Sequence, residues 1–138
     1  MTMISNRTSA EGNTQRSNEA LGFAEVFFHR QDKDRGEALY GMYHDQSTLI
    51  WNGSPYKTKT NITKFYQSQL ATETTVQALD AQIMPPMGDI IDMITVIAAG
   101  KIKQNDREYN FSRTFLLGPN SPTSTEYLIV SDTMRMHS

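Results

Sequence analysis

Residues 39–53 read LYGMYHDQSTLIWNG, and this stretch decides the fold of the chain. Its opening Leu-Tyr pair is typical of a helix end, and residues 47–51 form a short apolar strand that carries the only tryptophan. Asn52 and Gly53 are the residue pair that a type I′ turn requires, because both central residues of that turn have positive φ. The stretch therefore predicts a helix end, a strand and a tight turn.

Helical periodicity precedes this stretch. The first helix is expected to start at a cap, either Ser17 or Asn18, and its apolar residues recur at intervals of three and four: Ala20, Phe23, Ala24, Phe27 and Phe28. A second, short helix is expected to start at Asp34, whose spacing to Glu37 matches a capping box, or to use Asp32 as its cap instead.

A third helix follows the turn, and strands follow the helix. Thr60 is expected to cap this helix, and beyond residue 71 the apolar residues change to a period of two. Four strands are predicted, at residues 75–83, 89–99, 107–117 and 126–136, with hairpin loops at 100–106 and 118–125. Helices followed by a strand meander predict an α+β domain with the helices on one face of an antiparallel sheet.

The composition of the chain excludes several classes of function. The chain has 138 residues, which suits one domain, and residues 1–16 are polar enough to predict a disordered tail ahead of a domain at 17–138. A formal net charge of -2 argues against direct nucleic-acid binding. The absence of cysteine excludes disulfides and thiolate metal sites, and the three histidines lack metal-like spacing, so no metal or cofactor is expected. Neither a membrane span nor a signal peptide is expected.

The strand faces point to a binding surface. In the strand at 107–117 the bulky set is expected to face the helices: Tyr109, Phe111, Arg113, Phe115 and Leu117. The strand at 89–99 is apolar on both sides, with Ile91 and Ala99 on the second face, whereas a solvated sheet face should be polar. In the strand at 126–136, the alternation of side chains puts Leu128, Val130 and Met134 inside. The second face is therefore predicted to be an interface that includes Met93, Thr95, Ile97, Ser112, Thr114, Leu116, Ile129, Ser131, Thr133 and Arg135.

Taken in order, these segments resemble the nuclear-transport-factor-2-like fold over about residues 20–136. The closer resemblance is to the nuclear-transport-factor-2-related export proteins. The residues that carry the resemblance are Phe27-Phe28, Asp32-Lys33, Arg35, Leu39-Tyr40, Ser47, Leu49, Trp51-Asn52-Gly53, Ile62, Phe65-Tyr66, Asp80, Gln82, Phe111, Phe115-Leu116-Leu117, Ser131-Asp132 and Arg135.

The resemblance implies a fold, a partner and a location. The fold is three N-terminal helices packed on a strongly curved antiparallel sheet that forms a cone. The implied function is that of a non-catalytic messenger-RNA export cofactor, a heterodimer with the related domain of the nuclear RNA export factor Tap. Phe-Gly repeats of the nuclear pore would be bound only through the partner, and Arg135 would pair with an acidic residue across the interface. The implied location is the nucleus and nuclear pore, with shuttling to the cytoplasm.

Two alternatives belong to the same superfamily. A homodimeric import carrier is disfavoured, because its family receives a small GTPase on acidic residues where this chain has Lys101 and Lys103. A cone-fold isomerase or dehydratase would need an Asp base in an apolar pocket, with Asp132, Asp92 and Tyr40 as the candidates. One inward-facing Asp without a His or second acid beside it is a weak constellation, and the chain is expected not to be an enzyme.

Overall fold

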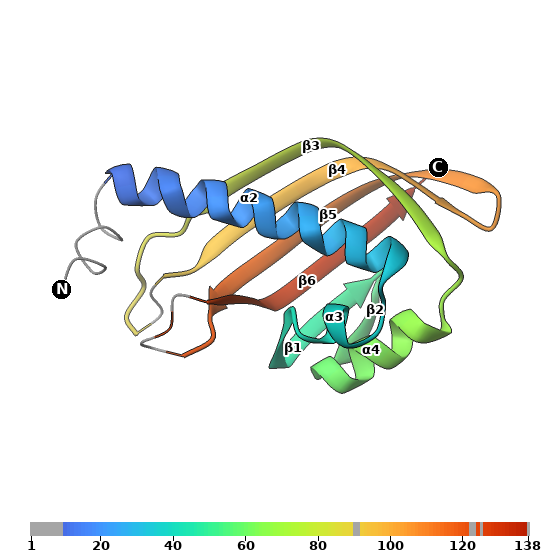
Figure 1. Cartoon of the computed structure of the whole chain (residues 1–138), viewed down its shortest axis with the longest axis horizontal. Coiled ribbons are helices and arrows are strands. Elements are labelled where there is room, and N and C mark those ends of the chain that lie inside the picture. The colour runs from blue at the N-terminus through green and yellow to red at the C-terminus, as the bar shows by residue number, and fades with distance from the viewer. Residues whose placement is uncertain (1–9, 90–91, 122–123, 125, 138) are drawn as a thin grey trace.

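A computed structural model of the chain describes residues 10–89, 92–121, 124 and 126–137. It contains helices and strands in the predicted α+β order (Figure 1). The elements are α2 (Ala10–Lys33), α3 (Glu37–Tyr40), β1 (Tyr43–Trp51), β2 (Ser54–Lys57), α4 (Lys59–Ser68), β3 (Thr72–Ile83), β4 (Ile94–Gln104), β5 (Arg107–Pro119) and β6 (Tyr127–His137).

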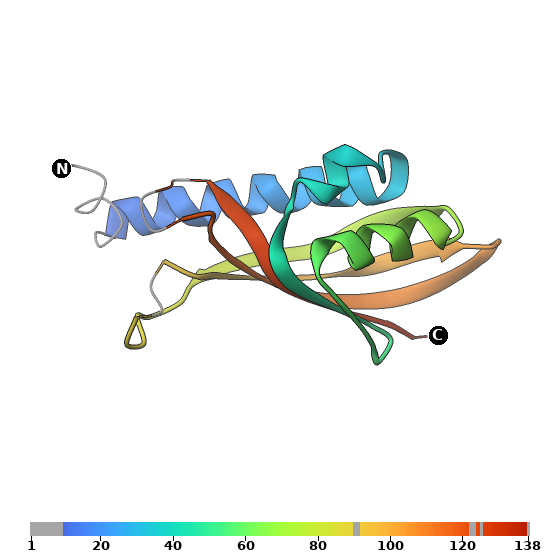
Figure 2. The ribbon, with the colours of Figure 1, turned by 90° about the horizontal axis from the view of Figure 1, so that it is seen from below.

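The described strands form one curled sheet in the order β2-β1-β6-β5-β4-β3. All neighbours pair antiparallel except β1 and β6, which run parallel, so the expectation of an antiparallel sheet is confirmed for every other pair. Helices α2 and α4 lie on the same side of this sheet, and no described helix covers the other side (Figure 2). The sheet therefore has a covered inner face and an open outer face.

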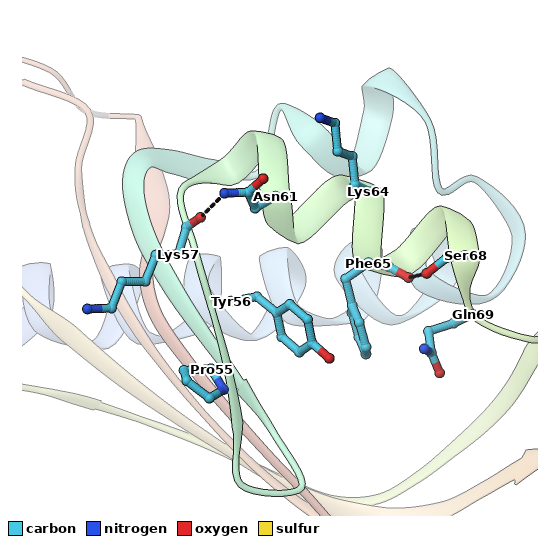
Figure 3. A pocket seen from close by; sticks show the side chains of 8 residues that line it. All are labelled: Pro55, Tyr56, Lys57, Asn61, Lys64, Phe65, Ser68 and Gln69. Carbon is cyan, nitrogen blue, oxygen red and sulfur yellow. Dashed lines mark hydrogen bonds between the residues drawn. The ribbon is translucent and has the colours of Figure 1, made fainter.

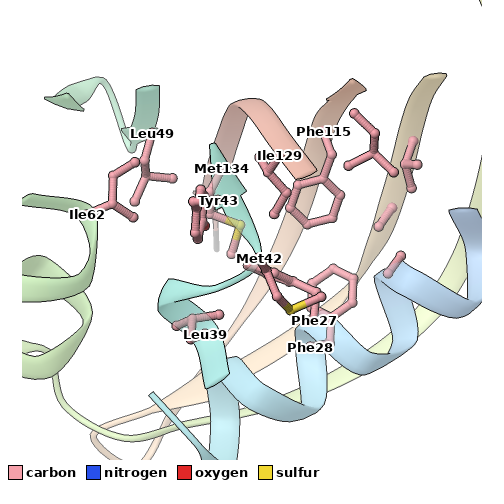
Figure 4. Packing of buried hydrophobic residues seen from close by; sticks show 14 of the residues in the cluster. Phe27, Phe28, Leu39, Met42, Tyr43, Leu49, Ile62, Phe115, Ile129 and Met134 are labelled. Atoms are coloured by element: carbon pink, nitrogen blue, oxygen red, sulfur yellow. The ribbon is translucent and has the colours of Figure 1, made fainter. Parts of the chain in front are cut away.

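The core lies between the sheet and the helices. Phe27 and Phe28 of α2 pack their rings against Phe115 of β5, with centroids 4.7 and 5.9 Å apart (Figure 4). Around Trp51, the rings of Phe65 and Tyr66 close the core between β1 and α4, at 5.3 and 5.9 Å. Such rings bury large apolar areas, which is the main favourable term in folding.

Helix α2 starts at Ala10, well before the expected cap at Ser17 or Asn18. Its early turns are held by the buried Arg16, whose Nε donates a hydrogen bond to the Tyr127 hydroxyl at 3.1 Å. The periodicity of apolar residues could not predict these early turns. Arg16 counts as a polar residue in such a pattern even though its alkyl stem packs on the protein. Residues 10–16 are therefore helical, and residues 1–9 of the predicted tail lie outside the described part of the chain.

The capping predictions were wrong for the other two helices. The N-cap of α3 is Gly36, which makes no side-chain cap bond. The Asp32 carboxylate instead accepts hydrogen bonds from Thr72 and Thr74 of β3, at 2.7–2.8 Å, so it joins α2 to the sheet. The cap of α4 is Thr58 rather than Thr60, because the chain turns directly after β2 with a Thr58 φ of 73°.

Two tight turns shape the strands. Asn52 and Gly53 have φ values of 50° and 89°, which confirms the predicted turn. The predicted loop at 100–106 is shorter than expected, because β4 continues to Gln104 and only Asn105 and Asp106 make the turn. Gly100 lies inside β4, opposite a bulge of β3, where a Cβ would stand 2.1 Å from the Thr75 carbonyl oxygen. Glycine is needed there for close backbone approach rather than for a loop.

Candidate partner-binding face

The outer face is the side of the sheet that the described helices leave uncovered (Figure 2). Strand registers arrange its side chains in rows that cross the sheet. The first row is Gln82, Thr95, Leu116, Ser131 and Thr48; the second is Asp80, Ile97, Thr114, Thr133 and Ile50; the third is Ala78, Ala99, Ser112 and Arg135. The centre of the face is apolar and hydroxyl-bearing, with a charge near each side.

Most of the predicted site residues meet on this face. Eight of them lie in the three rows: Thr95, Ile97, Ser112, Thr114, Leu116, Ser131, Thr133 and Arg135. Met93 directly precedes β4 at the margin of the face. A Cβ added to Gly118 would lie 2.9 Å from the Met93 sulfur. Ile90 and Ile91, also assigned to the strand faces, lie outside the described residues. The role of these side chains in binding a partner stays a prediction.

The prediction that Ile129 lies on the outer face was wrong, because this residue belongs to the core. Its side chain is 0% exposed, and its backbone N–H donates to the Met42 carbonyl at 2.8 Å. Leu117 pairs with Ile129 and Leu116 pairs with Ser131, so Val130 is an extra residue in a β-bulge. The bulge reverses the alternation of side chains along the start of β6. A Cβ added to Gly118 would lie 3.1 Å from Val130 Cγ2, so Val130, expected inside, lies on the outer side with that position.

Leu128 is the second residue that the bulge moves. It pairs with Gly118, so it lies on the outer side with Val130 rather than inside. Met134 lies beyond the bulge and is buried, as expected.

The sequence predicted the two flanking strands but did not assign their side chains to the outer face. Thr48 and Ile50 join the face because β1 runs parallel to β6, and Ile50 is 37% exposed. Asp80 and Gln82 join from β3, where they alternate with inward-facing residues. The alternation of Asp80 and Gln82 was a usable signal, whereas the pairing of β1 with a strand about 80 residues later leaves no local pattern.

Beneath the face lies a buried polar network. The Arg113 guanidinium donates to both carboxylate oxygens of Asp132, with Nε–Oδ1 at 2.9 Å and Nη2–Oδ2 at 2.7 Å. It also donates to the Tyr66 hydroxyl and to Gln31 Oε1, while the Tyr43 hydroxyl donates to Asp132 at 2.6 Å. Burial lowers the pKa of Arg113, but Asp132 together with Tyr66 and Tyr43 raises it more, so the Arg113 pKa lies above its ordinary value.

Asp132, the candidate base of the enzyme alternative, belongs to this network. Both oxygens of Asp132 accept hydrogen bonds from Arg113, so the carboxylate is committed to structure. The other two candidates lie near opposite ends of the long helix α2. Asp92 pairs with Arg16 at 3.8 Å, and the Tyr40 ring lies 4.2 Å from the Lys59 ammonium. The three candidates do not form one site.

A separate hollow of about 570 Å³ lies between the edge strand β2 and helix α4 (Figure 3). The rings of Tyr56 and Phe65 lie at its floor with centroids 4.2 Å apart, and Lys57 and Lys64 stand at its margin. Asn61 closes one side by donating from Nδ2 to the Lys57 carbonyl at 3.0 Å. This hollow opens widely to solvent.

The described part of the chain has neither a metal-binding cluster nor a membrane-spanning helix. No group of three or more His, Cys, Asp or Glu side chains is placed there to hold a metal ion. None of the described helices has the length and apolar character needed to cross a bilayer.

Two relatives cover most of the chain. The NTF2-related export protein 2 of Mus musculus is 29% identical over 116 residues, 82% of this chain and 81% of that protein. The NTF2-related export protein of Caenorhabditis elegans is 30% identical over 121 residues, 86% of this chain and 85% of that protein. The resemblance seen in the sequence is thus confirmed by proteins of that name.

Solved structures share the fold. Nuclear transport factor 2 of Cryptosporidium parvum has a TM-score of 0.71 at 22% identity, over 91% of this chain and 94% of that chain. The Mex67 NTF2-like domain of Chaetomium thermophilum, solved in complex with Mtr2, has a TM-score of 0.69 at 19% identity, over 88% and 85% of the two chains. The family model described as the nuclear transport factor 2 domain matches residues 19–136, and the chain therefore belongs to the nuclear transport factor 2 domain family.

Proposed function

We propose that the protein is a non-catalytic cofactor of messenger-RNA nuclear export. In this proposal its outer face packs on the related domain of a Tap-class nuclear RNA export factor, and the heterodimer stabilises the nucleoporin-binding module of that factor. The names of the relatives support a role in export, and the solved complex of Mex67 with Mtr2 supports association through a domain of this fold.

The observation that carries the proposal is the apolar centre of an open sheet face. Ile97 is 51% exposed there and Ile50 is 37% exposed, with Thr114 and Thr133 between them in one row. A solvated face of an antiparallel sheet is normally polar, and contiguous exposed apolar patches mark interaction surfaces. The flat, small-residue relief of this row fits another sheet better than the ridges of a helix.

Two further expectations complete the proposal. Phe-Gly repeats of the nuclear pore would be bound by the partner, so this chain would contribute stability to the module and work in the nucleus and at the pore. The chain would perform no chemistry, since Asp132 is engaged by Arg113 and is unavailable as a base.

The test is co-expression with the related domain of a Tap-class factor, followed by size-exclusion chromatography and calorimetry. We expect the wild-type chain to form a stable one-to-one heterodimer. Arg135→Glu should raise the Kd at least tenfold, because reversing a charge at the interface adds like-charge repulsion. Arg107→Glu is the matched control, since Arg107 is exposed at the far hairpin end of β5. A wild-type chain that ignores the Tap-class domain would overturn the proposal.

A further inference from the structure

We infer that Asn52 is a site of spontaneous deamidation, and that its conversion to isoaspartate releases the end of β6 from the β1–β2 hairpin. Asn52 is the one asparagine of the sequence that is followed by glycine. The modification consumes water and needs no enzyme. It goes beyond the proposed function and does not depend on the heterodimer.

The reaction starts when the backbone nitrogen of Gly53 attacks Cγ of the Asn52 side chain. A new N–C bond closes a succinimide ring, the attacking nitrogen gives up its proton, and the side-chain nitrogen leaves as ammonia. Water then opens the ring at either of its carbonyl groups. Opening at one carbonyl gives aspartate. Opening at the other gives isoaspartate, in which the main chain runs through Cβ and Cγ and is one carbon longer.

The turn leaves the attacking nitrogen accessible. Asn52 and Gly53 are both exposed, and their φ values are 50° and 89°. Among the turns and loops of the described residues, the Gly53 N–H makes no hydrogen bond that would hold it back. A Cβ built on Gly53 would have no atom within 4 Å. The position therefore has open space for the ring and for the water that hydrolyses it.

A backbone donor activates the carbonyl group that is attacked. The Met136 N–H donates to Asn52 Oδ1 at 2.7 Å. Attack at Cγ moves negative charge onto Oδ1, and a fixed donor at about 2.7–3.1 Å from such an oxygen stabilises the transition state. The fold therefore supplies a fixed donor at a place where an ordinary loop has only water.

Asn52 also holds the end of β6 against the hairpin (Figure 2). Its N–H donates to the Met134 carbonyl at 2.9 Å and its Oδ1 accepts from Met136, so one hydrogen bond lies on each side of Arg135. In isoaspartate the oxygen of the former side chain becomes a peptide oxygen, and it can no longer accept from Met136 in the same place. Conversion should therefore release the last residues of β6.

The turn between β4 and β5 is a matched control within the same chain. Asn105 and Asp106 have φ values of 54° and 60° and are both exposed, so this turn has the same backbone form. The residue that follows Asn105 carries a Cβ, which hinders attack by its nitrogen. No donor among the described residues binds the Asn105 side chain. Asn105 thus lacks both features that favour the reaction at Asn52.

The experiment incubates the folded wild-type chain in mildly alkaline buffer at physiological temperature. Peptide mass spectrometry follows each asparagine, and isoaspartate-specific enzymatic methylation counts the isoaspartate. We expect Asn52 to convert at least tenfold faster than Asn105. In Asp106→Gly, glycine follows Asn105 and suits the positive φ of the turn. Asn105 should then convert faster than before but remain at least threefold slower than Asn52, because it still lacks the donor.

Converted chains carry an added negative charge, so ion exchange separates them from the unmodified chain. In the isoaspartate form the Met136 amide should exchange its hydrogen with solvent at least tenfold faster, while the Phe115 amide in the core stays unchanged. Conversion at Asn52 no faster than at Asn105 in the wild-type chain would overturn the inference. Equal rates at the two asparagines in Asp106→Gly would overturn activation by Met136. Unchanged exchange at Met136 would overturn the release of β6.

Discussion

Arg113 and Asp132 form a bidentate ion pair in which both side chains are 0% exposed. The two residues lie on neighbouring strands, and the Arg113 guanidinium stands 4.6 Å from the centroid of the Phe27 ring. Thr114 and Thr133, next to them in sequence, project to the outer face. The buried pair therefore fixes the two strands whose other sides make up the centre of the predicted interface.

Removing one member of this pair should leave the other charge unpaired in the core. Asp132→Asn is expected to lower the free energy of unfolding by about 3–5 kcal/mol, as measured by urea denaturation. Asp80→Asn, on the surface, should change it by less than about 0.5 kcal/mol. The double variant Arg113→Met with Asp132→Leu should recover most of the loss, because an apolar pair leaves no charge buried. A near-neutral Asp132→Asn would contradict this account.

Stability should fall in alkaline solution as buried phenols become ionised. Burial raises the pKa of Tyr66 to about 12, and burial followed by the charge of Asp132 raises the pKa of Tyr43 well above its ordinary value. The unfolded chain releases these protons from about pH 10, whereas the folded chain keeps them, so the folded state binds more protons in this window. The contribution of these two phenols to the free energy of unfolding is complete below about pH 10 and is lost as the pH rises towards 12.

The shift of Tyr66 corresponds to roughly 3 kcal/mol of the free energy of unfolding. Urea denaturation at closely spaced pH values measures the slope, and Tyr66→Phe should make it shallower. An equal slope in the two proteins would show that Tyr66 does not carry the effect.

The bulge in β6 should separate a folding residue from a binding residue. Ile129→Ala removes core volume and is expected to cost about 2–5 kcal/mol of stability. Val130→Glu places a charge on the outer side, so it should weaken partner binding at least tenfold with a much smaller effect on thermal stability. Thermal denaturation and calorimetric titration of both variants check the assignment. The reverse pattern would mean that the parity of β6 is unbroken.

The sequence predicted the faces of β4 and β5 correctly, because these strands keep an unbroken period of two from Ile94 to Leu117 apart from their turn. It failed where a contact between distant segments overrides the local pattern. Asp32 looked like a helix cap but binds β3, and the bulge at Val130 exists only against Leu116. The inward position of Arg113 was foreseen, whereas its partner required the register of β5 against β6.

The central place of β6 in the sheet has a consequence for synthesis on the ribosome. The hairpin of β1 and β2 and the meander of β3, β4 and β5 are made first, yet they are joined only by β6, which comes last among the described strands. Until then β1 and β5 present unpaired edges, and Arg113 has no counter-charge. Nascent chains should therefore fold late, in one cooperative step, and depend on chaperones to shield these edges.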